Sequence, residues 1–178
     1  MKRDHSHFLG PIGGLGGKAA NNLAKETDLA ICVGTKLADF TTGSWANFEN
    51  PEFKLVSINI ARHDANKHLA EAVIGDAKVC LSELSNSLGN WKSPDSWYKK
   101  SQDELKSWNE YVDKESGPTN QETPNYAHAV GAIYRNSDPT DIAVTAAGGL
   151  VGEVVQVWRP KELNTHCLLY TSDAADDT

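Results

Sequence analysis

The stretch DLAICVGTKLADFTTGSW, residues 28–45, carries the strongest fold signal in the chain. Five apolar residues, 29–33, run directly into Gly34 and then into a turn rich in threonine, glycine and aspartate. A short apolar run bounded by a glycine is typical of a buried strand in a parallel sheet. In such sheets the loops after the carboxyl ends of the strands form the ligand crevice. The polar turn after Val33 is therefore expected at a ligand or a domain contact.

The residues around this stretch alternate between helix and strand patterns, which favours an α/β fold with a parallel, Rossmann-like sheet and helices on both faces. Residues 1–17 hold glycine and proline too densely for a regular element. Gly89 is a plausible stop for the helix that precedes it. The expected helices cover residues 18–27 and 78–90, and the expected strands cover residues 28–33, 54–61 and 71–77.

The composition becomes polar from Trp91 onward. Apolar residues near helical spacing predict an amphipathic helix that crosses between domains, and Gly and Pro in residues 117–124 predict a linker. A helix, a strand and a Gly-Gly turn that opens another helix follow. This order is the start of a second α/β domain. The expected elements of this part are a helix over 125–137, a strand over 141–147 and a helix from 148.

The overall composition excludes several classes of protein. The chain has 178 residues and a formal net charge of -7, with no run of Lys or Arg, so a nucleic-acid-binding surface is not expected. No apolar run reaches the length of a membrane span, and a cytoplasmic location is expected. Cys32, Cys80 and Cys167 are too few and too widely spaced for a disulfide framework or a CxxC metal site. Cys32 lies in the first strand and is expected to be a small core residue.

The glycine-rich segment GPIGGLGGKAA, residues 10–20, invites comparison with phosphate-binding loops. It fails the P-loop pattern, because Ile12 stands where a glycine is needed and Ala19 where Ser or Thr is needed. Two interpretations stay open. The glycines could bring backbone amides to an anion at the start of the helix. The simpler interpretation, a plain loop that leads into the helix, is favoured.

Other candidate residues carry weaker signals. His5 and His7 could chelate a metal, but no third ligand lies nearby in the sequence, so ordinary surface histidines are favoured. His63 and His68 stand five residues apart, which predicts a loop rather than one helix face. Thr42 and Ser44 lack an evident general base.

The segment TAAGGLVGE, residues 145–153, joins the last expected strand to a helix through Gly148 and Gly149. Backbone N–H groups at such a helix start can hold a diphosphate. The same glycines could instead serve tight strand–helix packing, and the residues alone leave both interpretations open.

Three segments together resemble the thiamine-diphosphate enzymes of the acetolactate synthase type, and within them the 3D-(3,5/4)-trihydroxycyclohexane-1,2-dione hydrolases of inositol catabolism. The segments are AANNLAKETDLAICVGTKLADFTTGSW, INIARHDANKH and VTAAGGLVGEVVQVWRP. The resemblance implies an internal fragment of a three-domain chain with pyrimidine-binding, central and diphosphate-binding domains. The implied boundaries are 1–90 for the C-terminal part of the central domain, 91–123 for an inter-domain helix and linker, and 124–165 for the start of the diphosphate-binding domain. Residues 166–178 are expected to be a non-native tail.

The resemblance also implies a function. Enzymes of this type use thiamine diphosphate and Mg²⁺, and the hydrolases cleave a C–C bond of a small cyclic dione to give 5-deoxy-glucuronate during myo-inositol degradation. Gly148, Gly149 and Leu150 match the turn that meets the diphosphate, with Leu150 offering only its backbone. The catalytic residues and the metal ligands are expected outside this chain, so the chain alone is expected to be inactive. The full-length protein is expected to form a homo-oligomer, a dimer or a tetramer. In some relatives the central domain binds FAD, and the glycine-rich segment before Lys18 would be the place for it here.

Two alternatives remain beside this interpretation. The chain could be a fragment of another thiamine-diphosphate enzyme, such as an acetolactate synthase-like protein. It could also be a non-catalytic nucleotide-binding module.

The C-terminal residues CLLYTSDAADDT match nothing before them and extend no expected element. Residues 167–177 can be encoded by a reading frame of a common sequencing adapter, which predicts that the tail is not native. An acidic, disordered C-terminus is the alternative.

Overall fold

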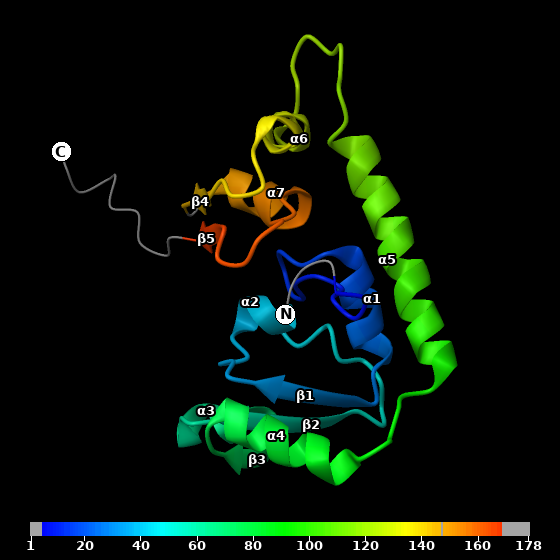
Figure 1. Ribbon diagram of the computed structural model, residues 1–178, viewed down its shortest axis with the longest axis vertical. Helices are drawn as coiled ribbons and strands as arrows, with labels where there is room; N and C mark the ends of the chain where they lie inside the picture. Colours follow the sequence, from blue (N-terminus) through cyan, green and yellow to red (C-terminus); the bar gives the residue numbers. More distant parts are fainter. Residues whose placement is uncertain (1–4, 147, 169–178) are drawn as a thin grey trace, which may run out of the picture. The chain divides into compact units, whose positions relative to one another are not determined.

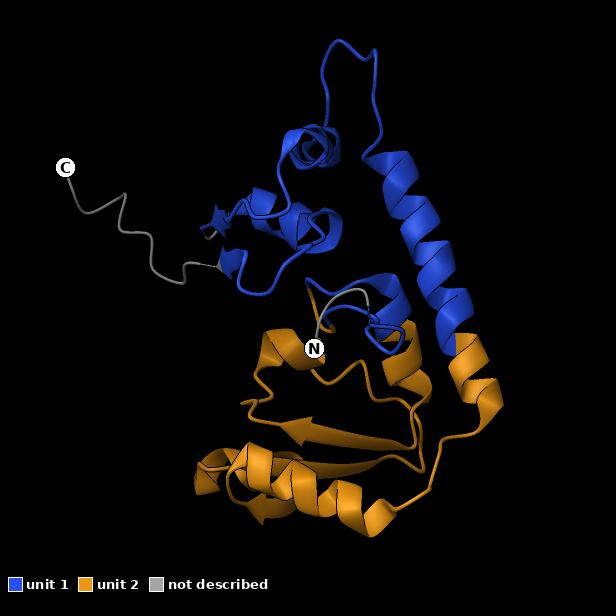
Figure 2. Cartoon of the chain, in the orientation of Figure 1, with its two compact units in different colours: residues 1–11, 15–20, 101–178 blue, residues 12–14, 21–100 orange. Residues whose placement is uncertain are grey.

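The computed structural model describes residues 5–146 and 148–168 and divides the chain into two compact units (Figure 2). One unit holds residues 1–11, 15–20 and 101–178, and we call it unit 1. The other, unit 2, holds residues 12–14 and 21–100. The domain boundaries inferred from the sequence stay a prediction.

Unit 2 is built on a three-stranded parallel sheet in the order β1-β2-β3 (Figure 1). Its strands are β1 (Leu29–Val33), β2 (Lys54–Asn59) and β3 (Glu71–Ile74). Leu29 lies opposite Lys54, and Val56 lies opposite Glu71. The central strand β2 is the most buried, as expected for a strand with neighbours on both edges. Parallel strands with helices on both sides confirm the α/β fold class.

The helices expected around this sheet are present. α1 (Lys18–Glu26) precedes β1, and α4 (Ala77–Leu88) follows β3 and ends at Gly89, which has the positive φ of 55° that favours glycine. α4 begins at an N-cap aspartate. The Asp76 carboxylate accepts hydrogen bonds from the backbone amides of Lys78 at 2.9 Å and Val79 at 3.1 Å. These bonds satisfy two amides that the helix itself leaves without acceptors.

The Asp76 cap allows a first prediction. The change Asp76→Ala is expected to lower the free energy of unfolding of unit 2 by about 1 kcal/mol, because both amides lose their acceptor. Glu83→Ala removes an exposed acid from the middle of the same helix and is the matched control. Urea denaturation followed by circular dichroism measures both variants. Equal stability of the two variants would contradict the assigned cap.

Two loops of unit 2 contain more helix than the sequence predicted. The polar turn after β1 includes a four-residue helix, α2 (Asp39–Thr42). The loop expected over residues 62–68 is wrong, because α3 (Arg62–Ala65) and the 3-10 helix η1 (Lys67–Leu69) lie there. The physical reason is packing: Ala65 is fully buried, and α3 contacts both β2 and β3.

Unit 1 has a small core of its own. It contains most of α5 (Asp95–Glu115), then α6 (Tyr126–Asn136), β4 (Ala143–Thr145), α7 (Gly149–Val157) and β5 (His166–Leu168). α6 packs against α7, and the ring of Trp158 meets that of Tyr134 edge-on at 5.4 Å between centroids. The predicted amphipathic helix and the second βα unit are confirmed. The buried core of unit 1 comprises Val112, Ala127, Val130, Val154, Val157 and Trp158.

The C-terminal segment corrects one expectation. β5 pairs with β4 in parallel, with Ala143 opposite His166 and Val144 opposite Cys167. The expectation that residues from 167 onward extend no element is therefore wrong for the first of them, because β4 offers an edge with unpaired backbone groups. Residues 169–178 lie outside the described residues, and the origin of the tail stays a prediction.

Among the described residues, no helix has both the length and the apolar character that crossing a bilayer requires.

Candidate functional site

The turn between β4 and α7 is the first candidate site, and it lies wholly in unit 1. Gly148 has φ 143°, a conformation that L side chains rarely adopt, and a Cβ placed there would have no heavy atom within 4 Å. The glycine is therefore needed for its conformation, and the space beside it is open. Gly149 and Leu150 form the first turn of α7, where amides have no acceptor within the helix. Such amides suit a phosphate group.

A second helix starts beside this turn. α6 begins at Tyr126, and a Cβ placed on Gly149 would lie 3.7 Å from Cε2 of the Tyr126 ring. The start of α6 is held by a reciprocal cap: the Asn125 side chain accepts from the His128 amide at 2.9 Å, and His128 Nδ1 accepts from the Asn125 amide at 3.3 Å. Sequence reasoning missed Tyr126, because only the fold brings it to residue 149.

An apolar groove of about 440 Å³ runs along β4 and reaches the start of α7. α6 contributes Val130 and Ile133 to its lining, and α7 contributes Leu150 and Val154. The Leu150 side chain thus lines the groove and is 44% exposed. Its backbone amide is the part of the residue that a ligand at the turn would meet.

The glycine-rich segment before α1 has a structural use for its glycines. The Gly13 amide donates to Asn21 Oδ1 at 2.8 Å, and Asn21 Nδ2 donates back to the Gly13 carbonyl at 3.0 Å. The Gly14 amide donates to the Phe40 carbonyl at 2.8 Å. In unit 1, the Gly17 amide donates to the Pro11 carbonyl at 3.0 Å. Because these three amides already have acceptors, the geometry favours the plain loop over an anion site.

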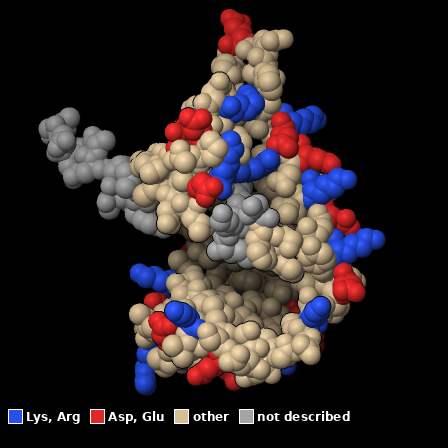
Figure 3. All heavy atoms as spheres, viewed as in Figure 1, with Lys and Arg blue, Asp and Glu red and all other residues tan. Residues whose placement is uncertain are grey.

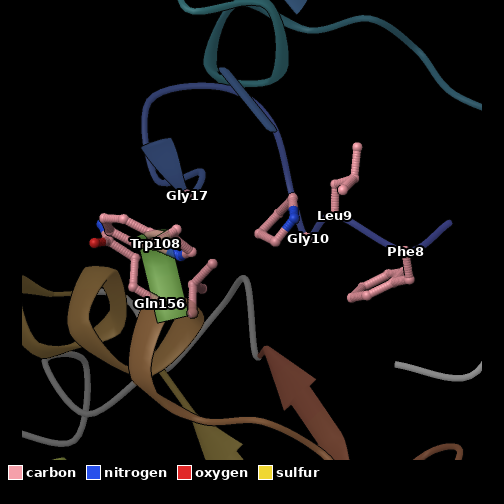
Figure 4. A pocket seen from close by; sticks show the side chains of 8 residues that line it. Phe8, Leu9, Gly10, Gly17, Trp108 and Gln156 are labelled. Atoms are coloured by element: carbon pink, nitrogen blue, oxygen red, sulfur yellow. The ribbon is translucent and has the colours of Figure 1, made fainter. Parts of the chain in front are cut away.

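Gly17 also permits close packing within unit 1. A Cβ on Gly17 would lie 2.9 Å from Trp108 Nε1, so a larger residue would displace the indole ring. Figure 4 shows Trp108 and Gln156 facing a small cavity whose far side is formed by residues 8–11. Its volume of about 30 Å³ is that of roughly one water molecule and is far too small for FAD.

The carboxyl edge of the unit 2 sheet is the second candidate site. Non-glycine residues with positive φ gather in the loops that follow β1 and β2, and such strain is concentrated at functional positions. Ser44 Oγ donates to Asp39 Oδ2 at 3.1 Å, and Thr42 Oγ1 donates to the Asp39 carbonyl at 3.2 Å and accepts from the Trp45 amide at 3.2 Å. These hydroxyls hold the turn in shape. The strained residues are Leu37, Ser44, Trp45, His68 and Leu69.

His68 joins the two strained loops. Its ring stacks on Trp45 at 4.3 Å between centroids. Its Nε2 lies 3.1 Å from the Leu37 carbonyl oxygen, which can only accept, so Nε2 carries the proton in this contact. Within the described part of the chain His63 makes no such link, so the pair of histidines predicted as loop residues does not form one site. His68 therefore links the loop after β1 to the loop after β2.

Asp64 lies among basic groups at this edge. Its carboxylate is 2.7 Å from Lys67 Nζ, and the hydrogen bond from Lys67 holds the pKa of Asp64 below its ordinary value of 3.8, with smaller contributions from the charges of His63 and Lys36. The ionised form therefore stabilises this loop above pH 3.8, and that contribution is lost as the pH falls through the lowered pKa.

A second prediction follows for Asp64. The change Lys67→Ala is expected to raise the Asp64 pKa toward 3.8, because it removes the main hydrogen-bond donor. Lys36→Ala is the matched control and is expected to raise it less, since Lys36 acts only by its charge. Carboxyl-carbon NMR titration measures the pKa in each variant. An Asp64 pKa that does not move in Lys67→Ala would contradict the ion pair.

Acidic and basic side chains are interspersed on the face shown in Figure 3. Among the described residues, no group of three His, Cys, Asp or Glu side chains is arranged to hold a metal ion. His5 and His7 lie near each other, with ring centroids 5.4 Å apart, but His5 Nδ1 accepts from the His7 amide at 3.1 Å.

Comparison with known proteins gives a family match for part of the chain. Residues 1–84 match the family model described as "Thiamine pyrophosphate enzyme, central domain". The match takes in the three strands of unit 2 and most of α4, so the strained carboxyl edge lies within the matched residues. The Gly148 turn lies outside the matched residues.

Curated relatives extend the similarity over nearly the whole chain. The 3D-(3,5/4)-trihydroxycyclohexane-1,2-dione hydrolase of Clostridium perfringens (strain 13 / Type A) is 31% identical over 96% of this chain. Proteins of the same name from Bacillus anthracis (strain CDC 684 / NRRL 3495) and Bacillus cereus (strain AH820) are each also 31% identical over 96%. The chain spans about 30% of the length of each of these relatives.

Proposed function

We propose that this chain is a segment of a thiamine-diphosphate-dependent hydrolase that cleaves a C–C bond of cyclic 3D-(3,5/4)-trihydroxycyclohexane-1,2-dione to give 5-deoxy-glucuronate in myo-inositol degradation. One observation carries the proposal: 31% identity to hydrolases of this name runs over 96% of the chain, across both units. Residues 1–84 also match the family model of thiamine enzyme central domains, which supports the proposal. We also propose that the enzyme uses Mg²⁺, lies in the cytoplasm and forms a homo-oligomer.

The turn between β4 and α7 fits this proposal. The open space over Gly148 and the amides of Gly149 and Leu150 provide backbone donors without side chains in the way. Thiamine diphosphate, when bound, supplies the carbon nucleophile and the electron sink for C–C cleavage. The contribution of this chain would be to hold the diphosphate at the start of α7, while the Leu150 side chain packs in the groove. The central domain would have a mainly structural role.

A chimeric protein tests the proposal. The matching segment of the Clostridium perfringens hydrolase is replaced by residues 5–165 of this chain, and dione hydrolysis is measured with thiamine diphosphate and Mg²⁺. We expect the chimera to hydrolyse the dione and the isolated 178-residue chain to be inactive. A folded chimera that forms acetolactate from pyruvate instead would favour the acetolactate synthase-like alternative.

A non-catalytic nucleotide-binding module is the remaining alternative. Calorimetry of the isolated chain with FAD and NAD tests it, and tight binding of either dinucleotide would favour it. The amides of Gly13, Gly14 and Gly17 are already bonded within the protein, which argues against that outcome.

A further inference from the structure

We draw no further inference here: the strongest candidate, the apolar groove of about 440 Å³ that runs along β4 between α6 and α7, is an unpartnered apolar face, and nothing in the structure shows what covers it.

Discussion

The change Gly13→Ala is expected to lower the free energy of unfolding of unit 2 by about 2–5 kcal/mol. Gly13 has φ 101°, which costs an L residue about 1–2 kcal/mol. A Cβ there would lie 2.0 Å from the Phe40 carbonyl oxygen and 2.8 Å from that of Thr41. Both atoms belong to the backbone of α2, so no side-chain rotation relieves the clash, and forced shifts of this kind cost about 1–3 kcal/mol more. Urea denaturation followed by tryptophan fluorescence measures the loss.

Gly34→Ala separates the two causes. Gly34 lies in unit 2 like Gly13 and has a positive φ of 63°, but a Cβ there would meet nothing within 4 Å. This variant should therefore carry the conformational cost alone, about 1–2 kcal/mol. If both variants lost the same stability, close packing of residue 13 on α2 would play no part. Gly13 would then be needed only for its backbone angle.

The sequence predicted the elements of this protein well, because each depends on local periodicity. The strand at residues 29–33 and the helix at 18–26 follow from apolar spacing, and both occur at the expected positions. The helix over 62–65 was missed, since four residues are too few to show a period and Ala65 is buried by tertiary contacts with the sheet. The pairing of β5 with β4 was missed for the same reason, because a three-residue strand is defined by its partner.

For the candidate site at the turn between β4 and α7, the sequence predicted the backbone turn but not the side chains beside it. The Gly-Gly pair after a strand predicted the turn at Gly148, because glycine at a strand–helix junction has few other uses. Tyr126 could not have been found from the sequence, since it precedes Gly149 by a helix, a loop and a strand. The glycine-rich segment shows the opposite case. Its composition suggests a phosphate loop, yet the contacts of Gly13 and Gly17 show that close packing explains the glycines.

The change Gly131→Ala is expected to have the largest effect on unit 1, with a loss of about 1–3 kcal/mol in the free energy of unfolding. Gly131 lies within α6 where that helix crosses the end of α5. A Cβ there would lie 2.1 Å from the Ser116 carbonyl oxygen and 2.8 Å from the Ser116 Cβ. The same carbonyl accepts from Arg135 Nη1 at 2.5 Å, so moving it also disturbs this hydrogen bond. The packing cost should exceed the gain of about 1 kcal/mol that alanine brings to a helix.

Gly152→Ala is the matched control, because Gly152 also lies inside a helix of unit 1, but a Cβ there would be 3.5 Å from Leu15 Cδ2, an ordinary contact. Alanine should stabilise α7 by about 0.5–1 kcal/mol through its helix propensity. The two substitutions are chemically identical and should have opposite signs. Hydrogen exchange of the α6 and α7 amides measures both, with faster exchange expected in Gly131→Ala and slower exchange in Gly152→Ala. Stabilisation by both variants would mean that α6 does not approach the end of α5 as closely as the 2.1 Å clash requires.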